Sequence, residues 1–435
     1  MNGGFGELYR SVANGTRGRV YPNPFTDRVS NERAERPHRA VYLENEHLRF
    51  MILPEFGGRI HEGLDKSNGF NFFYRQHVIK PALIGLFGSW MSGGVEFNWP
   101  QHHRPSTFMP VHHWIEEGDD GSRTVWLSEH DPMERLKGMV GICLHPGKAW
   151  VEFRVQLTNR TPLVQTFLWW VNVGVHVHDD YQVVFPPDVT AVTDHSKRAM
   201  AHFPIAQERY YGVDLEGVDL RWYKHIPVPC SYFCYHSDQD YFGGYDHRRR
   251  AGLIHVANHH ISPGKKMFTW GKAAFGDAWE RNLTETDGPY IELMAGVYTD
   301  NQPDFSWLQP YETKTFSQFW YPIQEIGPPV AANRRLALNL QIDREGDGAQ
   351  AVLRVVLPDD VRGDLQIAGA TAEDILPVKA LQQVIAASSE QGVIADAGIE
   401  LVITGTADQG IIACRADEFV RAGAAIQQII TGAPL

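Results

Sequence analysis

Short stretches of alternating apolar and polar residues, separated by turn residues, follow one another from about residue 39 to residue 325. The alternation is clearest in WVEFRVQLTN (150–159). Comparable segments are TVWLSE, TFLWWVNVGVHV and GPYIELMAGVYT, bounded by Gly, Pro, Asn or Asp. A period of two puts successive side chains on opposite faces of a β-strand, and no long amphipathic helical period precedes residue 370. The pattern predicts a mostly β architecture of the large antiparallel sandwich type.

Composition changes along the chain and divides it into three parts. Residues 1–37 are polar and turn-rich, which predicts an irregular arm, and residues 38–330 carry the strand pattern. The stretch IGPPVAANRR (326–335) is typical of a linker. Residues 333–435 have almost no aromatic residues and alternate expected strands (ALNLQID, AQAVLRVVLP, GIELVITGTA) with expected helices (PVKALQQVIAAS, DEFVRAGAAIQQII). We therefore expect a small C-terminal α+β domain from about residue 333.

Overall composition excludes several classes of protein. The 435 residues carry 40 Lys and Arg against 52 Asp and Glu, a formal net charge of −12, which argues against nucleic acid as the main partner. No run of about 18 apolar residues and no signal-peptide core is present, so neither a membrane span nor secretion is expected. The four cysteines are few and scattered, which favours free thiols in a reducing compartment. A soluble, cytoplasmic protein is the expectation; the oligomeric state is left open.

Aromatic residues are abundant, with 12 Trp, 16 Tyr and 22 Phe. Aromatic-rich β proteins often bind sugars, because the apolar faces of pyranoses stack on rings. A core rich in large residues explains the same composition equally simply. Any sugar site should lie in the aromatic-rich part of the chain before residue 330, and Trp99 and Trp170 are candidate contacts there.

Four clusters hold the residues that could do chemistry. Residues 88–114 combine Gly, Pro and Trp with ionisable groups, as a ligand cleft requires, although a surface loop with incidental histidines is the plainer explanation. In residues 169–186, two alternating histidines share a strand face with Asn172 and Gly174, and a core role for them is equally open. Residues 241–256 place Asp246 in a Gly-rich turn that could be a simple hairpin. The ionisable residues of the first two clusters are Glu96, His102, His103, His112, His113, His176 and His178.

The fourth cluster, GPYIELMAGVYTDNQPDF (288–305), contains Glu292 between Ile291 and Leu293. A carboxylate in an apolar strand is unfavourable unless it is paired or has a raised pKa, which makes Glu292 the best single candidate for a general base or acid. The alternative is a glutamate on the solvent face of an edge strand.

Sequence motifs of other chemistries are absent. There is no GxGxxG after a strand, no P-loop, no GxSxG elbow and no HExxH. Glu96 and two or three histidines of the first cluster could hold a metal, but their spacing matches no closed zinc pattern. No metal and no cofactor are therefore predicted, and a metal at this cluster stays an open alternative.

The order of these clusters resembles the galactose mutarotase-like superfamily, which includes aldose 1-epimerases and hexose-6-phosphate epimerase relatives. GGV with WP and PVHHW (93–114) is similar to the GG-x-P…WP…P-x-HG stretch of the epimerases, and YIELMAGVYTDNQPDF to the signature LE-x-Q-xx-PDA. More closely, GGRI, IKPALIGL, GGVEFNWPQHH and NPFTDRVSNE resemble a bacterial family of unknown function, domain of unknown function 5107. This resemblance covers roughly residues 20–325 and implies an antiparallel β-supersandwich.

The resemblance also implies roles for individual residues. Glu292 matches the general base, Asp246 a ligand of sugar hydroxyls, and His176 the general acid, in an uncertain register that lets His178 exchange roles with it. His112 or His113 matches the second active-site histidine. His103, Gln302, Trp99 and Trp170 complete the expected substrate contacts.

Two departures affect the expected reaction. The mutarotase stretch N-H-x-YFNL is here NVGVHV, and Glu96 has no counterpart in the epimerase pattern. Two carboxylates facing one sugar suit glycoside hydrolysis, with one protonated and one ionised. The sequence therefore favours a glycoside hydrolase that acts on a mono- or oligosaccharide with Glu292, Glu96 and His176 as catalytic residues. Aldose 1-epimerisation and non-catalytic carbohydrate binding are the alternatives.

Overall fold

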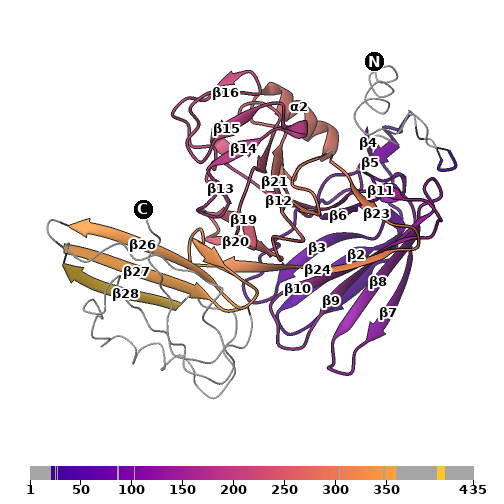
Figure 1. The fold of residues 1–435 in the computed structure, drawn as a ribbon, viewed down its shortest axis with the longest axis horizontal. Coiled ribbons are helices and arrows are strands. Elements are labelled where there is room, and N and C mark those ends of the chain that lie inside the picture. Colours follow the sequence, from indigo (N-terminus) through magenta and orange to yellow (C-terminus); the bar gives the residue numbers. More distant parts are fainter. Residues whose placement is uncertain are drawn as a thin grey trace.

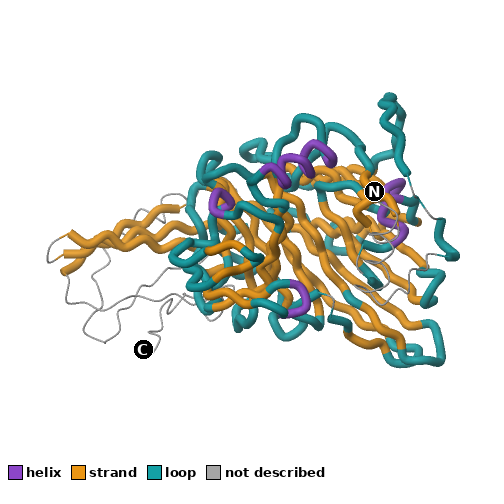
Figure 2. Tube along the Cα trace, turned by 90° about the horizontal axis from the view of Figure 1, so that it is seen from above, coloured by secondary structure: helices purple, strands orange, loops and turns teal. Residues whose placement is uncertain are grey.

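Two large antiparallel sheets dominate the computed structural model, which describes residues 21–24, 26, 28–85, 88–101, 103–302, 304–345, 348–358 and 399–406. Figure 1 shows the sheets packed as a sandwich, and Figure 2 shows their strands running side by side, with loops and short helices around them. The mostly β, antiparallel fold class expected from the sequence is confirmed.

The first sheet has ten strands among the described residues. Their spatial order is β1 (Val41–Glu44), β2 (Leu48–Leu53), β3 (Arg59–Asp65), β6 (Val95–Asn98), β12 (Trp169–His176), β22 (Tyr290–Val297), β21 (Gly264–Thr269), β18 (Cys230–Cys234), β14 (Ala191–Thr193) and β15 (Met200–His202). β6, β12 and β22 are therefore central strands, although they come from three separate parts of the chain.

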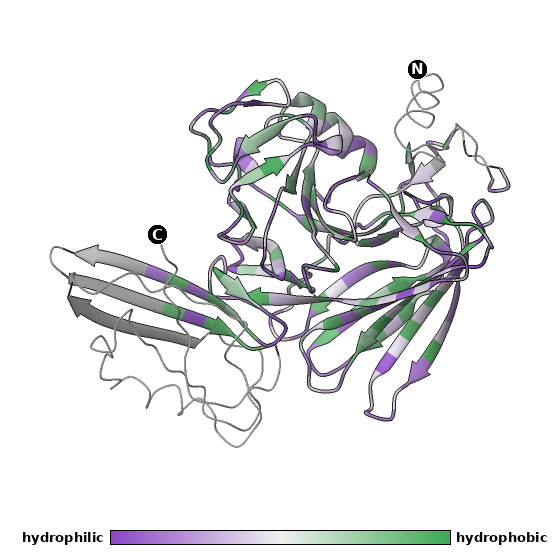
Figure 3. Ribbon diagram, in the orientation of Figure 1, coloured by the Kyte–Doolittle hydropathy of each residue, from purple (hydrophilic) through white to green (hydrophobic). Residues whose placement is uncertain are grey.

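The second sheet has eight strands within the same described ranges. Their order is β13 (Tyr181–Val184), β19 (Tyr241–Asp246), β20 (Ala251–Val256), β24 (Thr313–Gln324), β10 (Val151–Asn159), β9 (Leu136–Leu144), β8 (Arg123–His130) and β7 (His112–Glu117). β10 alternates buried and half-buried residues along its whole length, as its sequence predicts. Figure 3 shows the same alternation of hydrophilic and hydrophobic residues along these strands.

The main core lies between the two sheets. The first sheet contributes Val95, Phe97, Val171, Val173 and Leu293, and the second contributes Phe153 and Val155. Full burial of one such side chain stabilises the fold by about 1.5–3 kcal/mol. The opposite face of β6, β12 and β22 is also buried, because further segments of the chain cover it. This covered face carries the polar residues of the candidate site.

Smaller elements surround the sandwich. The two-stranded pairs are β4 (Ala82–Gly85) with β5 (Gly88–Trp90), β11 (Gln165–Phe167) with β23 (Ser306–Leu308), and β16 (Arg209–Tyr210) with β17 (Val213–Asp214). The short helical turns are η1 (Pro54–Phe56), η2 (Pro105–Phe108), η3 (His195–Lys197) and η4 (Tyr223–His225). No helix of the described residues is long and apolar enough to cross a membrane.

Helix α2 (Ala274–Leu283) was not expected from the sequence. Only Gly276 and Leu283 of its ten residues are buried, so its apolar period is too short to stand out from the surrounding strands.

The strands expected after residue 333 are present. A four-stranded sheet contains β25 (Ala331–Ala332), β26 (Ala337–Glu345), β27 (Gly348–Val356) and β28 (Ile399–Thr406), and it projects to the left of the sandwich in Figure 1. The two expected helices lie outside the described residues, and the domain boundaries of 1–37, 38–330 and 333–435 stay a prediction. Ala332, Ala337 and Val356 pack with Trp150 and Tyr321 of the sandwich in one apolar cluster.

Candidate functional site

Glu96 and Glu292 lie on the same face of the ten-stranded sheet. Glu96 of β6 is paired with Asn172 of β12, and Glu292 of β22 is paired with Gly174 of β12. Asn172 and Gly174 are two residues apart and so share a face. The two glutamate backbones are two strand spacings apart across the sheet, roughly 10 Å, and are offset by two residues along it, roughly 7 Å. The edge-strand alternative for Glu292 is wrong, because β22 is central and Glu292 is 7% exposed.

Glu96 is fully engaged by its neighbours. Thr107 donates its hydroxyl proton to Oε1 over 2.6 Å, and Trp90 donates its indole N–H to Oε2 over 2.8 Å. Nδ1 of His103 lies 3.1 Å from Oε2. Burial raises the pKa of Glu96, but the charge and hydrogen bond of His103, followed by Arg59 and Thr107, lower it to about 2. Glu96 is therefore held as a carboxylate and is a weak base.

Glu292 is in the opposite situation. None of the residues that the structure describes forms a hydrogen bond with its carboxyl group, although the side chain is buried. Burial raises the pKa of Glu292, and the negative charge of Glu96 raises it further. The charges of His103, Lys266 and Arg59 lower it, but the net result is a raised pKa. A buried carboxyl with a raised pKa is suited to proton transfer near neutral pH.

His103 links the two carboxyl groups electrostatically. Its side chain is 11% exposed, packs edge-on against Trp90 with 5.4 Å between ring centroids, and is placed by a backbone φ of 29°. Because a carboxylate only accepts hydrogen bonds, the contact with Glu96 places a proton on Nδ1 and orients the ring. Burial has the largest effect on the pKa of Glu292, and the charge of His103 has the second largest.

Lys266 of β21 belongs to the same buried group, and sequence reasoning missed it. Its Nζ donates to Oε1 of Gln302 over 2.8 Å and lies 3.2 Å from Nε2 of His195. The expected substrate residue Gln302 thus lies in the site beside a lysine. Lys265 and Lys266 follow Pro-Gly in the sequence, a pattern typical of an exposed turn, so nothing in it indicated that both would be buried.

Several buried polar groups near the two glutamates have no hydrogen-bond partner within the described part of the chain. They include both side-chain atoms of Asn98 and Asn172, Nε1 of Trp170, Nε2 of Gln302, and Nε and Nη2 of Arg59. Asn98, Asn172 and Trp170 share the face of Glu96 through the pairing of Trp170 with Asn98 and of Asn172 with Glu96. Donors and acceptors of this kind suit a ligand with several hydroxyl groups. Arg59 was also missed, although it lies in the GGRI motif.

Aromatic rings enclose this polar face on two sides. One apolar cluster contains Tyr74, Trp90 and Tyr290, with Trp270 and Trp279 packed against it. The other contains Trp170, Phe233 and Met294. Of the two expected tryptophans, Trp170 therefore lies at the site. Trp99 lies in the core between the sheets.

His176, His178 and Asp246 form a separate group. His176 is at the end of β12, with its ring 4.3 Å from that of Tyr74, and burial lowers its pKa to about 4. It lines a small pocket with Asp246 and Arg249. His178 lies beyond the end of β12 and contacts Asp246, with 2.7 Å between Nε2 and Oδ1. The structure thus does not join His178 and Asp246 to the group around Glu292.

His112 and His113 lie on the other sheet from Glu96 and Glu292. Both are exposed on β7, the edge strand of the eight-stranded sheet. The structure therefore gives neither of them the place of a second active-site histidine, and His103 lies closest to that role.

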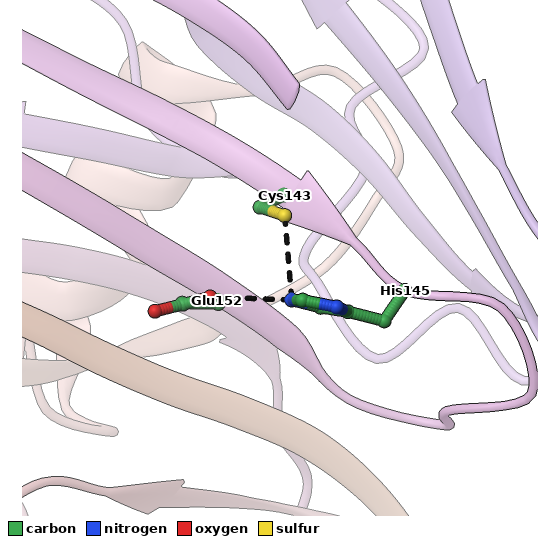
Figure 4. A group of neighbouring side chains, drawn as sticks. All are labelled: Cys143, His145 and Glu152. Atoms are coloured by element: carbon green, nitrogen blue, oxygen red, sulfur yellow. Dashed lines mark hydrogen bonds and ion pairs between the residues drawn. The ribbon is translucent and has the colours of Figure 1, made fainter. Parts of the chain in front are cut away.

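A further cluster lies on the eight-stranded sheet, where Figure 4 shows Cys143, His145 and Glu152 converging. Nε2 of His145 is 3.5 Å from Sγ of Cys143 and 3.3 Å from Oε2 of Glu152. Arg154 donates to the same Glu152 oxygen over 2.9 Å and also contacts His145 over 3.3 Å. The guanidinium already supplies the positive charge at this point, so we describe the cluster as an ion-pair network.

Comparison with known proteins identifies the class of the chain. Residues 16–323 match the family described as Domain of unknown function (DUF5107), and the chain belongs to this family. The family assignment made from the sequence is thereby confirmed.

Solved structures of other proteins are similar to parts of this chain. The chain is similar to a TPR-domain containing protein from Parabacteroides distasonis, with 25% identity and a TM-score of 0.61 over 70% of this chain. The match spans only 50% of that protein. It also matches galactose mutarotase-like proteins from Clostridium acetobutylicum (10% identity, TM-score 0.47, 66% of this chain and 96% of that one) and Lactobacillus casei (9%, 0.44, 65% and 100%).

Proposed function

We propose that this chain binds a carbohydrate on the covered face of the ten-stranded sheet and transfers protons at its anomeric centre, as an aldose 1-epimerase does. The observation that carries the proposal is that two carboxyl groups with opposite pKa shifts lie on one face of the sheet. Glu292 is buried with a raised pKa, and Glu96 is held ionised beside His103. Aromatic walls and unpartnered polar atoms around them support a sugar as the ligand.

The proposed reaction needs one base and one acid. Glu292 takes the proton of the anomeric hydroxyl group while an acid protonates the ring oxygen, and the ring opens. Rotation about the C1–C2 bond and reversal of both proton transfers give the other anomer. His103 is the proposed acid for two reasons. Among the neighbouring charges it has the largest effect on the pKa of Glu292, and its contact with Glu96 fixes the orientation of its ring.

The same geometry gives glycoside hydrolysis less support. Hydrolysis requires a second carboxylate that attacks the sugar or activates water. Both oxygens of Glu96 already accept hydrogen bonds, and its pKa of about 2 makes it a poor base. Glu96 is better suited to orienting His103.

The test compares wild type with Glu292→Gln and, as a matched control, Glu117→Gln on the exposed strand β7. Exchange between α and β anomers is followed by NMR for a panel of aldoses, and release of reducing sugar is measured with glycosides. We expect anomer exchange that falls at least about 10²-fold in Glu292→Gln and is unchanged in the control. If the chain binds sugar but exchanges no anomers, it is a carbohydrate-binding module and not an epimerase. If it releases reducing sugar in a reaction that depends on Glu292, it is a glycoside hydrolase.

A further inference from the structure

Lys266 is a buried cation that the proposed reaction does not use. It is 2% exposed and lies on β21, the strand next to β22. Lys266 is paired with Met294 and Phe268 with Glu292, so Lys266 and Glu292 are diagonal neighbours on one face. Such positions are roughly 7–8 Å apart, within the reach of a lysine side chain.

The hydrogen-bond partners of Lys266 carry no negative charge. Oε1 of Gln302 is a neutral amide oxygen. Burial, followed by the charges of Lys266 and Arg198, lowers the pKa of His195 well below its usual range, so this imidazole is neutral. Its Nδ1 lies 3.3 Å from the Ser231 hydroxyl, which leaves Nε2 to accept from Lys266.

Two phenylalanine rings also lie close to the ammonium group. Nζ lies 4.8 Å from the ring centroid of Phe233 and 5.8 Å from that of Phe268. Ring faces stabilise a cation but do not neutralise it. Among the described residues, Glu292 is the group whose charge favours the ammonium form of Lys266.

Other ionisable groups also lie near Glu292. Arg59 of β3, Glu96 of β6 and His103 after β6 all act on it, and Tyr290 lies two residues before it on β22. Glu96 and His103 form a pair with each other. Arg59 is shared by the two glutamates, and Glu96 has the larger effect on it.

We propose that Lys266 is a positioning residue for Glu292: its ammonium group holds the Glu292 carboxyl in the ionised form that accepts a proton. The inference deepens the proposed function, since it concerns the charge state of the same carboxyl group. Burial lowers the pKa of Lys266 to about 7 against the opposing effect of Glu292. The effect of Lys266 should therefore be complete well below pH 7, fall by half near pH 7 and disappear above it.

The test reads the carboxyl group directly and needs no sugar. The protein is labelled with ¹³C at glutamate carboxyl carbons, and the Glu292 signal is assigned by its loss in Glu292→Gln. Its chemical shift is followed against pH in wild type, Lys266→Met, Lys266→Arg and Lys265→Met. Lys265 is a matched control, because it is equally buried on the same strand but paired with Ala295, on the opposite face.

We expect the pKa of Glu292 to rise by at least one unit in Lys266→Met and to be unchanged in Lys265→Met. The wild-type signal should show a second, smaller step near pH 7, which Lys266→Arg abolishes because arginine does not titrate there. An unchanged pKa in Lys266→Met, or an equal shift in Lys265→Met, would overturn the proposal. If Lys266→Met does not fold, persistence of the second step in Lys266→Arg would do so. A chain that shows these shifts but exchanges no anomers would refute the proposed function alone.

Discussion

Asn172 and Gly174, two residues apart on β12, are the backbone partners of Glu96 and Glu292, respectively. The positions of the two glutamates are thus set by backbone pairing with one strand. Their different protonation follows from their neighbours, since Glu96 has three hydrogen-bonding partners and Glu292 has none among the described residues.

The first prediction concerns acid stability. The pKa of Glu96 is lowered from 4.5 to about 2 in the folded protein, so its contribution is complete above pH 4.5 and lost as the pH falls toward 2. We expect Glu96→Gln to be about 3 kcal/mol less stable than wild type at pH 7, and this difference to shrink below pH 4.5. Urea unfolding at a series of pH values measures it. Glu117→Gln, at an exposed ion pair with Arg123, should cost less than about 1 kcal/mol throughout.

The second prediction concerns the packing of Gly296 against Trp170, which lies at the candidate site. A methyl group added at Gly296 would lie 2.4 Å from the indole of Trp170, which is completely buried. Gly296→Ala should therefore destabilise the protein by about 1–3 kcal/mol through overpacking. The smaller ring in a Gly296→Ala/Trp170→Phe double variant should recover part of this loss. Strictly additive free energies of unfolding would show that the two side chains do not meet.

The third prediction separates a structural from a ligand-binding aspartate. Oδ1 of Asp246 accepts from the backbone N–H groups of Arg248 and Arg249, and also contacts His178. We expect Asp246→Asn to lower stability by about 1–3 kcal/mol while sugar affinity changes less than threefold. Thermal unfolding and calorimetric titration with sugar measure the two effects. A large loss of affinity with unchanged stability would make Asp246 a ligand of the sugar.

The fourth prediction concerns a buried histidine. Burial, followed by the charge of Arg59, lowers the pKa of His61 to about 4, so the folded protein keeps this imidazole neutral. The unfolded chain takes up a proton below about pH 6.5, and stability should fall between pH 6.5 and 4. His61→Gln should have a flatter stability profile over this range than wild type. A matched change at the exposed His236 should leave the profile unaltered.

The sequence was most informative where a pattern repeats. Alternation over many strands predicted the sandwich, and the apolar neighbours of Glu292 in the sequence made it the best single candidate for a general base or acid. It was least informative about contacts between distant strands. Lys266 and Arg59 act on Glu292 only because their strands lie near β22 in the sheet, in the order β21, β22, β12, β6 and β3. His112 and His113 are close to Glu96 in sequence, but the chain passes to the other sheet before reaching them.

The shared partner strand also limits which changes of chain length the site can tolerate. A slip of one residue in the pairing of β6 with β12 would turn Glu96 into the apolar core between the sheets and put Phe97 in its place on the covered face. Loops such as the one between β7 and β8 can lengthen without this consequence. We therefore expect relatives of this chain to differ in length at their turns, while β6, β12 and β22 keep their number of residues.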